Sequence, residues 1–182
     1  MKELSLNVLD ITMNSVKAGA TLIEIFLTET ETRLELIIRD NGCGMTDETV
    51  EQLKNPFYTT RTTRKVGMGV PLLTLAAEQT GGTMTVESRH KDAYPDNHGT
   101  VVTAVFHTDH IDCPPVGDMT ATVTTLIQGH PDTDFYFRHV CDGTEVELDT
   151  RALREILGEV SLAEFEVLQW ITGYLTDQYN GQ

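Results

Sequence analysis

The chain has 182 residues, 40% of them hydrophobic and 23% charged, which suits one domain with an appendage or two small domains and excludes wholesale disorder. Its net charge of −15 disfavours nucleic acid, whose phosphates it would repel, and its three cysteines are too few for a disulfide framework. No apolar run approaches the roughly 20 residues of a membrane helix, and the start of the chain lacks a signal-peptide pattern, so we expect a cytoplasmic protein with neither a nucleic-acid nor a membrane partner.

The first part of the chain predicts a helix, a hairpin and a glycine turn in succession. Apolar residues fall on one broad face of a helix over residues 3–18, which Gly19 ends. Residues 21–28 and 33–39 alternate apolar and polar side chains, as in a hairpin with one buried face. The second strand leads directly into the turn Asp40-Asn41-Gly42-Cys43-Gly44-Met45.

A loop, a second helix and two more strands are expected next. The composition of residues 47–66, rich in threonine and cations, predicts a surface loop. Residues 68–79 predict a helix, because Pro71 falls in its first turn, where proline is tolerated. Two strands are expected over residues 84–88 and 101–106.

Beyond residue 108 both the pattern and the charge change. Residues 1–108 carry 10 Lys and Arg against 14 Asp and Glu, whereas residues 109–182 carry 3 against 14. We therefore expect a first domain over 1–108 and a small, acidic α+β C-terminal region over 109–182 that can dock a partner. Ser161 and Glu164 form a capping-box pattern at the start of its last helix. The elements expected in this region are helices over 117–128, 150–157 and 161–177 and a strand pair over 134–140 and 144–148.

Polar residues and glycines of the first domain fit a nucleotide pocket. Asp40, at the end of a buried strand, can accept a hydrogen bond from the exocyclic amine of a base, while Gly42 and Gly44 let the backbone pass close by. Asp10 and Asn14 lie four residues apart and face the same way on their helix. The asparagine offers an oxygen to Mg²⁺, and the aspartate can orient or deprotonate a nucleophile. Taken singly, the turn also fits an ordinary Asx turn, and the pair fits an exposed polar stripe.

Downstream residues can complete such a pocket. Gly67 and Gly69 precede a helix, so free backbone N–H groups there favour an anion. Three cations of the loop can close over phosphates: Arg61, Arg64 and Lys65. A solvated charge cluster is the simpler interpretation of each cation alone. Thr100 can place its hydroxyl against Asp40, although many strand threonines have no such role.

In this order the motifs resemble the boxes of the GHKL superfamily, most closely the catalytic domains of histidine kinases and also anti-sigma serine kinases. The resemblance covers residues 1–107 and includes Asn55-Pro56-Phe57-Tyr58-Thr59-Thr60, which is similar to a phosphate lid. It implies an α/β (α+β) two-layer sandwich, in which helices cover one face of a mixed sheet. It also implies that the cofactors are ATP and Mg²⁺.

The resemblance implies roles for individual residues. Asn14 would be the Mg²⁺ ligand, Asp40 would contact the adenine amine, and Asp10 would be catalytic. The other cofactor-binding residues that it implies are Lys17, Gly42, Gly44, Met45, Phe57, Thr59, Thr60, Arg61, Arg64, Lys65, Val66, Gly67, Met68, Gly69, Val70 and Thr100. The family's usual glutamate is Asp10 here, and the shorter side chain affects catalysis more than binding.

The expected function is phosphoryl transfer from Mg-ATP to an unidentified partner protein in signalling, because no helical hairpin with a phosphoacceptor histidine precedes the domain. The alternative is a nucleotide-dependent switch or regulator with slow or no turnover. A relic that binds nothing is the third hypothesis. Related domains often dimerise, so a homodimer is also an open alternative.

A second candidate site lies in the C-terminal region. His107, His110 and Cys113 are spaced like zinc ligands, and His139 with Cys141 can complete the set. Without a Cys-x-x-Cys pair, isolated polar residues at a domain junction are the default interpretation. The aromatic residues of this region fit a core or docking face, with partner binding as the alternative.

Overall fold

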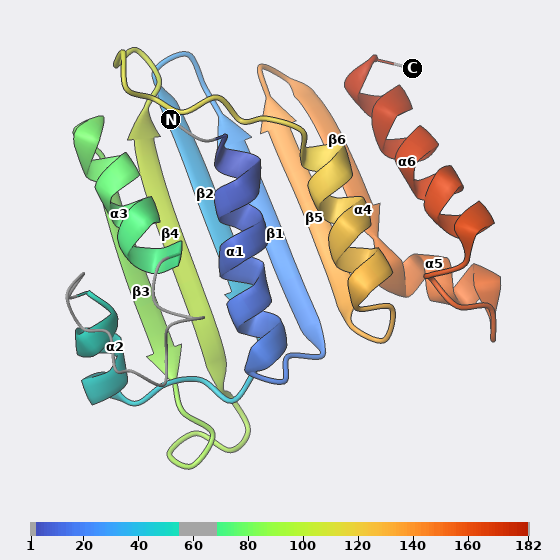
Figure 1. Cartoon of the computed structure of the whole chain (residues 1–182), viewed down its shortest axis with the longest axis horizontal. Coiled ribbons are helices and arrows are strands. Elements are labelled where there is room, and N and C mark those ends of the chain that lie inside the picture. The colour runs from blue at the N-terminus through green and yellow to red at the C-terminus, as the bar shows by residue number, and fades with distance from the viewer. Residues whose placement is uncertain (1–2, 55–68, 182) are drawn as a thin grey trace.

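The computed structural model describes residues 3–54 and 69–181. Within them a six-stranded sheet, in the order β3-β4-β2-β1-β5-β6, is covered on one face by helices (Figure 1). The strands are β1 (Leu22–Glu29), β2 (Arg33–Asp40), β3 (Thr83–Arg89), β4 (Gly99–His107), β5 (Asp134–Cys141) and β6 (Thr144–Asp149). The helices are α1 (Leu4–Lys17), α2 (Asp47–Leu53), α3 (Gly69–Gln79), α4 (Met119–Gly129), α5 (Thr150–Leu157) and α6 (Phe165–Tyr179). This mixed two-layer sandwich confirms the predicted fold class.

The core lies between the sheet and the helices, because alternate side chains of each strand point to the covered face. The inward residues of adjacent strands are fully buried: Ile23, Ile25, Leu27, Leu34, Leu36, Ile38, Ala104, Phe106, Phe135 and Phe137. Burying one large apolar side chain contributes about 1.5–3 kcal/mol, so this shared layer supplies most of the driving force for the sheet.

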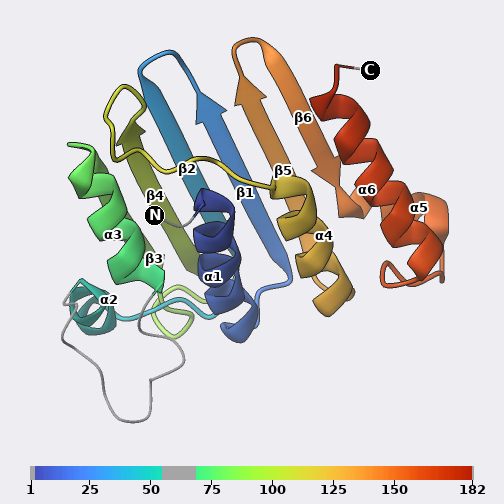
Figure 2. The same ribbon diagram turned by 45° about the horizontal axis from the view of Figure 1, so that its top comes forward.

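Helices α1, α3 and α4 lie side by side over this layer (Figures 1 and 2). The backbone N–H groups of Leu4 and Ser5, at the start of α1, donate to the carbonyl oxygens of Pro115 and Val116, both at 2.8 Å. The connection that leads into α4 is therefore bonded to α1. Gly19 follows α1 with a φ of 75°, the left-handed conformation that ends helices, as predicted.

The two C-terminal strands extend the same sheet. β5 pairs in parallel with β1 along the whole of both strands, from Leu22 opposite Asp134 to Glu29 opposite Cys141. β6 then pairs antiparallel with β5. The predicted boundary after residue 108 marks a change in charge within a continuous sheet, and as a domain boundary it stays a prediction.

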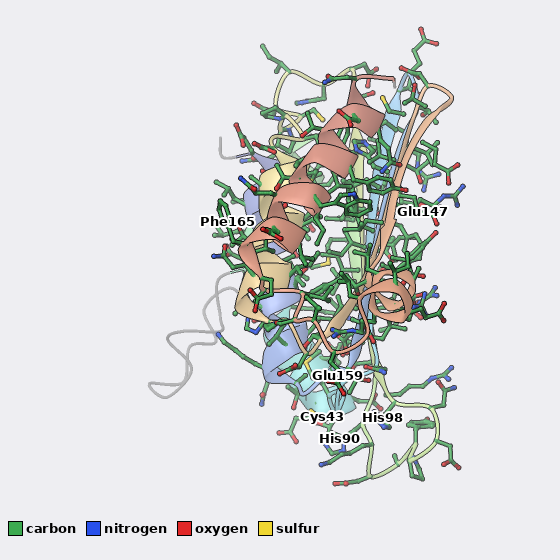
Figure 3. All side chains as sticks on the ribbon, turned by 90° about the vertical axis from the view of Figure 1, so that its right-hand side faces the viewer. Cys43, His90, His98, Glu147, Glu159 and Phe165 are labelled. Atoms are coloured by element: carbon green, nitrogen blue, oxygen red, sulfur yellow. The ribbon has the colours of Figure 1, made fainter. Side chains whose placement is uncertain are left out.

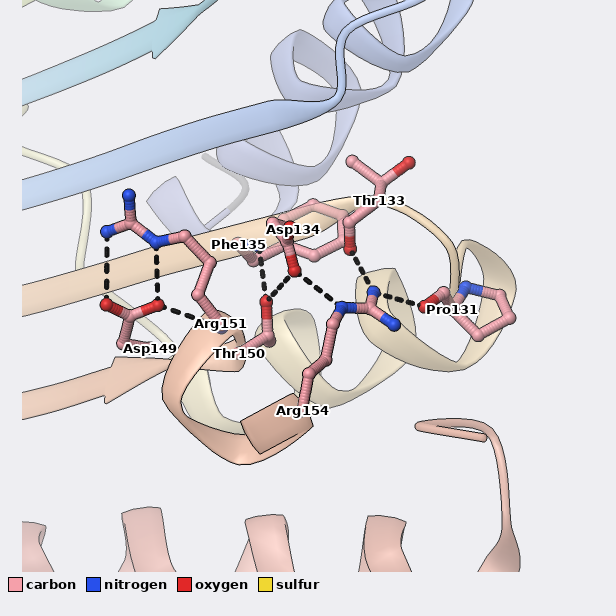
Figure 4. Close-up of polar contacts among 8 residues, drawn as sticks. All are labelled: Pro131, Thr133, Asp134, Phe135, Asp149, Thr150, Arg151 and Arg154. Carbon is pink, nitrogen blue, oxygen red and sulfur yellow. Dashed lines mark hydrogen bonds and ion pairs between the residues drawn. The ribbon is translucent and has the colours of Figure 1, made fainter. Parts of the chain in front are cut away.

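Helix α5 is bonded to the start of β5 by a polar network (Figure 4). The Thr150 hydroxyl donates to Asp134 Oδ1 at 3.0 Å and accepts from the Phe135 N–H at 2.8 Å. Arg154 Nε donates to the same Asp134 oxygen at 2.7 Å.

Among the helices of the described ranges, none combines the length and the apolarity that crossing a bilayer requires.

The predicted loop over residues 47–66 is wrong in its first part, where α2 forms. Its N-cap is Thr46, whose hydroxyl accepts from the Thr49 N–H at 3.3 Å, and Asp47 and Glu48 follow in the first turn. A hydroxyl cap and early acids both stabilise a helix start. Residues 55–66 lie outside the described part of the chain.

The predicted capping box at Ser161 is also wrong, because α6 begins at Phe165. The Ser161 hydroxyl instead accepts from the Ala163 N–H at 3.1 Å, within a turn that buries Leu162 completely. Burial of this leucine outweighs an early helix start. The other predicted helices and strands are confirmed, with small differences at their ends.

Candidate functional site

A cavity of about 240 Å³ lies where α1, α2, α3 and the Asp40 turn meet strands β3 and β4. Its lining residues are Ile11, Asn14, Ser15, Lys17, Ala18, Asp40, Cys43, Gly44, Met45, Leu53, Val70, Val86, Thr100 and Val102. Mainly apolar walls with a few convergent polar groups are typical of small-molecule sites. Seven predicted site residues are brought together here: Asn14, Lys17, Asp40, Gly44, Met45, Val70 and Thr100.

The Asp40 carboxylate is held in place by two donors. The Ser15 hydroxyl on α1 donates to Asp40 Oδ2 at 2.6 Å, and the Gly42 backbone N–H donates to Oδ1 at 2.9 Å. An ionised carboxylate offers about four lone-pair positions, so both oxygens keep acceptor capacity after these bonds. The side chain is thus positioned and can accept a further hydrogen bond from a ligand donor in the cavity.

The glycines of the Asp40 turn are required by close contacts within the protein. A Cβ on Gly44, whose φ is 70°, would come within 1.9 Å of the Arg89 carbonyl oxygen. A Cβ on Gly42 would come within 2.8 Å of Ala18 Cβ. These glycines let the turn pack against α1 and the end of β3, and the predicted approach of a base to them stays a prediction.

Thr100 lines the cavity, but its hydroxyl does not bond to Asp40 as predicted. Its Oγ1 lies 2.8 Å from Ser88 Oγ, and that oxygen accepts from the Met45 N–H at 2.7 Å. Thr100 stands opposite both Asp40 on β2 and Ser88 on β3, and its hydroxyl bonds to the serine. The serine network ties the Asp40 turn to β3.

Asn14 and Asp10 occupy different positions relative to the cavity. Asn14 is half-buried in its wall, and within the described ranges its amide has no hydrogen-bond partner. A free amide oxygen fits the preference of Mg²⁺ for oxygen ligands. Asp10 is exposed and outside the lining residues, next to the start of α3: a Cβ on Gly69 would lie 3.4 Å from Asp10 Cβ.

The remaining predicted site residues belong to the segment around the proposed lid. Phe57, Thr59, Thr60, Arg61, Arg64, Lys65, Val66, Gly67 and Met68 lie outside the described residues. Their proposed contacts with phosphates stay predictions.

Sequence reasoning missed several wall residues of the cavity, namely Ile11, Ser15, Ala18, Cys43, Leu53, Val86 and Val102. The alternation of the strands could have indicated Val86 and Val102, since both point to the covered face. Ser15 directly follows Asn14, but helix periodicity alone does not reveal that it reaches Asp40 across a chain separation of 25 residues.

The second candidate site is organised around the buried side chain of His139. His139 is buried, with its Nε2 at 2.6 Å from Glu29 Oε1 and its Nδ1 at 2.8 Å from the Tyr179 hydroxyl. Burial, and after it the Glu29 carboxylate, raises the pKa of both the Cys113 and the Cys141 thiol. In the described residues, no group of three or more His, Cys, Asp or Glu is arranged to hold a metal ion.

Comparison with known proteins defines the family. The profile of the family described as "Histidine kinase-, DNA gyrase B-, and HSP90-like ATPase" matches residues 1–110. The chain belongs to this ATPase family, and its ATP-binding domain is related to those of sensor histidine kinases.

Two curated relatives are sensor kinases. The sensor histidine kinase YvrG of Bacillus subtilis (strain 168) is 33% identical over 99 residues, which are 51% of this chain and 16% of that kinase. The tetrathionate sensor histidine kinase TtrS of Salmonella typhimurium (strain LT2) is 33% identical over 97 residues, 53% of this chain and 16% of that kinase. The chain thus spans about one sixth of the length of either kinase.

A solved structure is similar over more of the chain. The crystal structure of the N-terminal domain of a DNA repair protein superposes with a TM-score of 0.54 and 21% identity. The match covers 82% of this chain and 53% of that chain. At this identity the likeness shows a shared fold.

Proposed function

We propose that this chain binds Mg-ATP in the cavity beside Asp40 and transfers the terminal phosphate to a partner protein. The observation that carries the proposal is the Asp40 carboxylate, held by Ser15 and the Gly42 N–H in the wall of a mainly apolar cavity. A carboxylate accepts hydrogen bonds only, so it favours a base with an exocyclic amine over one with a carbonyl at that edge.

Other residues take the remaining roles in the proposal. Asn14, which lines the cavity and offers an amide oxygen, holds Mg²⁺, which neutralises charge on the phosphates. Asp10, beside the start of α3, accepts a proton from the incoming hydroxyl or imidazole. Three cations outside the described residues contact the phosphates: Arg61, Arg64 and Lys65.

A second function is favoured by the position of Asp10. This residue is exposed and outside the cavity lining, and its side chain is one methylene shorter than the glutamate usual at this position in similar domains. Misplacement of a catalytic group by about 1 Å costs roughly a hundredfold in rate. The alternative is therefore a protein that ATP switches between two states of partner binding, with slow or absent turnover.

Calorimetric titration with ATP and Mg²⁺ tests the binding step. We expect saturable binding to the native chain, weaker binding of GTP, and a loss of about tenfold or more in ATP affinity for Asp40→Asn. Asp96→Asn, which makes the same charge change at an exposed position of the β3–β4 connection, is the matched control and should bind as the native chain does. Absence of binding, or equal affinities in both variants, would refute the proposal.

Phosphate release separates the two functions. If the chain is a kinase or ATPase, native protein releases phosphate from ATP or labels a partner, and Asp10→Asn abolishes this without changing ATP affinity. If the chain is a switch, the native protein and Asp10→Asn release phosphate equally slowly.

Light scattering with and without ATP tests whether the protein also dimerises, which stays a prediction.

A further inference from the structure

A groove of about 510 Å³ follows the β6 edge of the sheet, between α5 and α6. Its lining residues are Glu145, Glu147, Leu148, Asp149, Ala152, Leu153, Ile156, Trp170, Tyr174 and Gln178. Figure 3 looks onto this edge, with Glu147 on the strand and Phe165 at the start of α6. The ATP-site candidate lies among α1–α3 and β2–β4, so the two sites are separated by β1 and β5.

One wall of the groove presents a stacked aromatic pair. Trp170 and Tyr174 lie one turn apart on α6, with ring centroids 4.8 Å apart and ring planes at 11°. Their exposed fractions are 51% and 41%, and Ile156 across the groove is 82% exposed. Stacked rings with accessible faces bind cations by cation–π contact, and arginine also stacks on them.

The other wall is acidic. Glu145, Glu147 and Asp149 line the groove, while its lining contains neither lysine nor arginine. Arg138 pairs with Glu145 at 2.9 Å, and Arg151 pairs with Asp149 at 3.0 Å. The third arginine of residues 109–182, Arg154, is engaged by Asp134 (Figure 4).

Glu147 is left without a cation. Across residues 3–54 and 69–181 no ion pair involves its carboxylate. Together with burial, this carboxylate raises the pKa of Tyr136 on the neighbouring strand. Strand alternation turns this carboxylate to the uncovered side of the β6 edge, since Val146 and Leu148 are buried toward the helices, and there it is suited to a guanidinium or ammonium group.

The backbone of β6 is obstructed at Glu147 for one common mode of peptide binding. Strand addition needs free N–H and C=O groups on an edge strand. The Gln178 side chain occupies both groups of Glu147, accepting from its N–H at 2.9 Å and donating to its carbonyl at 3.0 Å. Strand addition is therefore blocked at Glu147, in the middle of the edge, and side-chain contacts carry the recognition proposed below.

We propose that this groove docks a basic segment of a partner protein, whose cations contact Trp170 and Tyr174 on the α6 side of the β6 edge and Glu147 on its uncovered side. Charge selects this occupant: a second copy of the region, with 14 acidic against 3 basic residues, would be repelled, and so would phosphates. The apolar part of the segment contacts Ile156 and Leu153. The proposal is independent of nucleotide chemistry.

Trp170 is the single tryptophan of the chain, so its fluorescence reports the groove directly. The probe is a synthetic amphipathic peptide of arginine and leucine, titrated into the full chain beside the same peptide with glutamate in place of arginine. We expect a saturable change in Trp170 emission with the basic peptide alone, weakening as salt is raised.

Two charge-reversal variants make the test specific. Glu147→Lys should weaken peptide binding by about tenfold or more, because it places a like charge where the cation docks. Glu78→Lys, an equal charge change at an exposed position of α3, should leave it unchanged. Tyr174→Ala should also weaken binding while Trp170 still reports it.

Several results would overturn the proposal. These are the absence of an emission change, an equal response to the acidic and basic peptides, or equal peptide affinities for Glu147→Lys and Glu78→Lys. Saturable binding of duplex DNA or anionic vesicles that Glu147→Lys or Tyr174→Ala weakens would also overturn it. ATP affinity, measured on the same samples, should be equal in both charge variants. Failure of peptide binding with intact ATP binding would refute the groove alone.

Discussion

The polar side chains around Asp40 and those around His139 lie on the same sheet. They differ in how many of their hydrogen-bonding atoms are already bonded within the protein. At the end of β2, Asp40 accepts from Ser15 and Gly42 and still has free lone pairs facing a cavity. On β5, both ring nitrogens of His139 are bonded, one to Glu29 and one to Tyr179. Spare acceptor capacity beside a cavity suits Asp40 to a ligand contact, whereas the bonds at both nitrogens suit His139 to a structural contact.

The comparison extends to the two halves of the chain. Residues 3–107 hold the cavity of the ATPase family, while β5, β6 and the C-terminal helices supply sheet pairing and an acidic edge. Yet the halves share one core, since Phe135 and Phe137 are as buried as Phe106. One continuous sheet and core therefore hold both the cavity and the acidic edge.

The largest expected effect comes from removing the C-terminal half. A chain ending at residue 108 loses the β5 strand that pairs along one side of β1, and it loses the cover supplied by α4. We expect it to lose cooperative thermal unfolding, measured by circular dichroism, and to aggregate, measured by size exclusion. A monomeric fragment with a sharp transition and native ATP affinity would show instead that the pocket half folds alone, as the predicted domain boundary implies.

A smaller effect is expected at the pocket. Ser15→Ala removes the hydroxyl that positions Asp40, and hydrogen bonds to charged groups contribute about 1.5–3 kcal/mol. We expect ATP affinity to fall by about tenfold, measured by calorimetry, because 1.4 kcal/mol corresponds to that factor. Ser5→Ala is the matched control, since Ser5 is a buried serine of the same helix with its hydroxyl on Glu3. Equal affinities in the two variants would remove Ser15 from the site.

The smallest effect is expected at the C-terminal cluster. Tyr179→Phe deletes the hydroxyl at His139, at a cost of about 0.5–1.5 kcal/mol in unfolding free energy, measured with urea, and leaves ATP affinity unchanged. Tyr94→Phe, on an exposed ring, is the control and should be neutral. A change of ATP affinity in Tyr179→Phe would mean that the two polar groups are coupled.

The same tyrosine gives a pH dependence. Burial, followed by the Glu29 carboxylate, raises the pKa of Tyr179 above its ordinary value near 10. The folded state therefore holds this proton more tightly, so the contribution is complete below about pH 10 and is lost as pH rises further. Urea unfolding at successive alkaline pH values should show a shallower loss in Tyr179→Phe than in Tyr94→Phe.

Much of the fold is predictable because local patterns and tertiary burial agree. The alternation of β1 and β2 matches the buried face of the sheet, and Gly19 ends α1 in the expected conformation. The prediction failed where tertiary burial decides: Leu162 delays α6 despite an earlier capping pattern. Parallel pairing of β1 with β5 is invisible to local patterns, since it joins residues distant in sequence.

The candidate site was predictable in part. Asn14 and Asp40 follow from motif chemistry, and both reach one cavity. The Ser15–Asp40 bond depends on how α1 lies over β2, and the bond from Thr100 to Ser88 depends on sheet register. Neither geometry is encoded by spacing along the chain.

The pairing of Leu22 with Asp134 has a consequence for synthesis on the ribosome. At translation rates of about 5–20 residues per second, β1 waits roughly 5–20 s for its parallel partner. During that interval the nascent chain presents an open edge on a strand with an apolar face, Leu22–Glu29, which is a template for pairing with other nascent chains. The sheet is completed only late in translation, so this edge of β1 stays unpaired until β5 emerges.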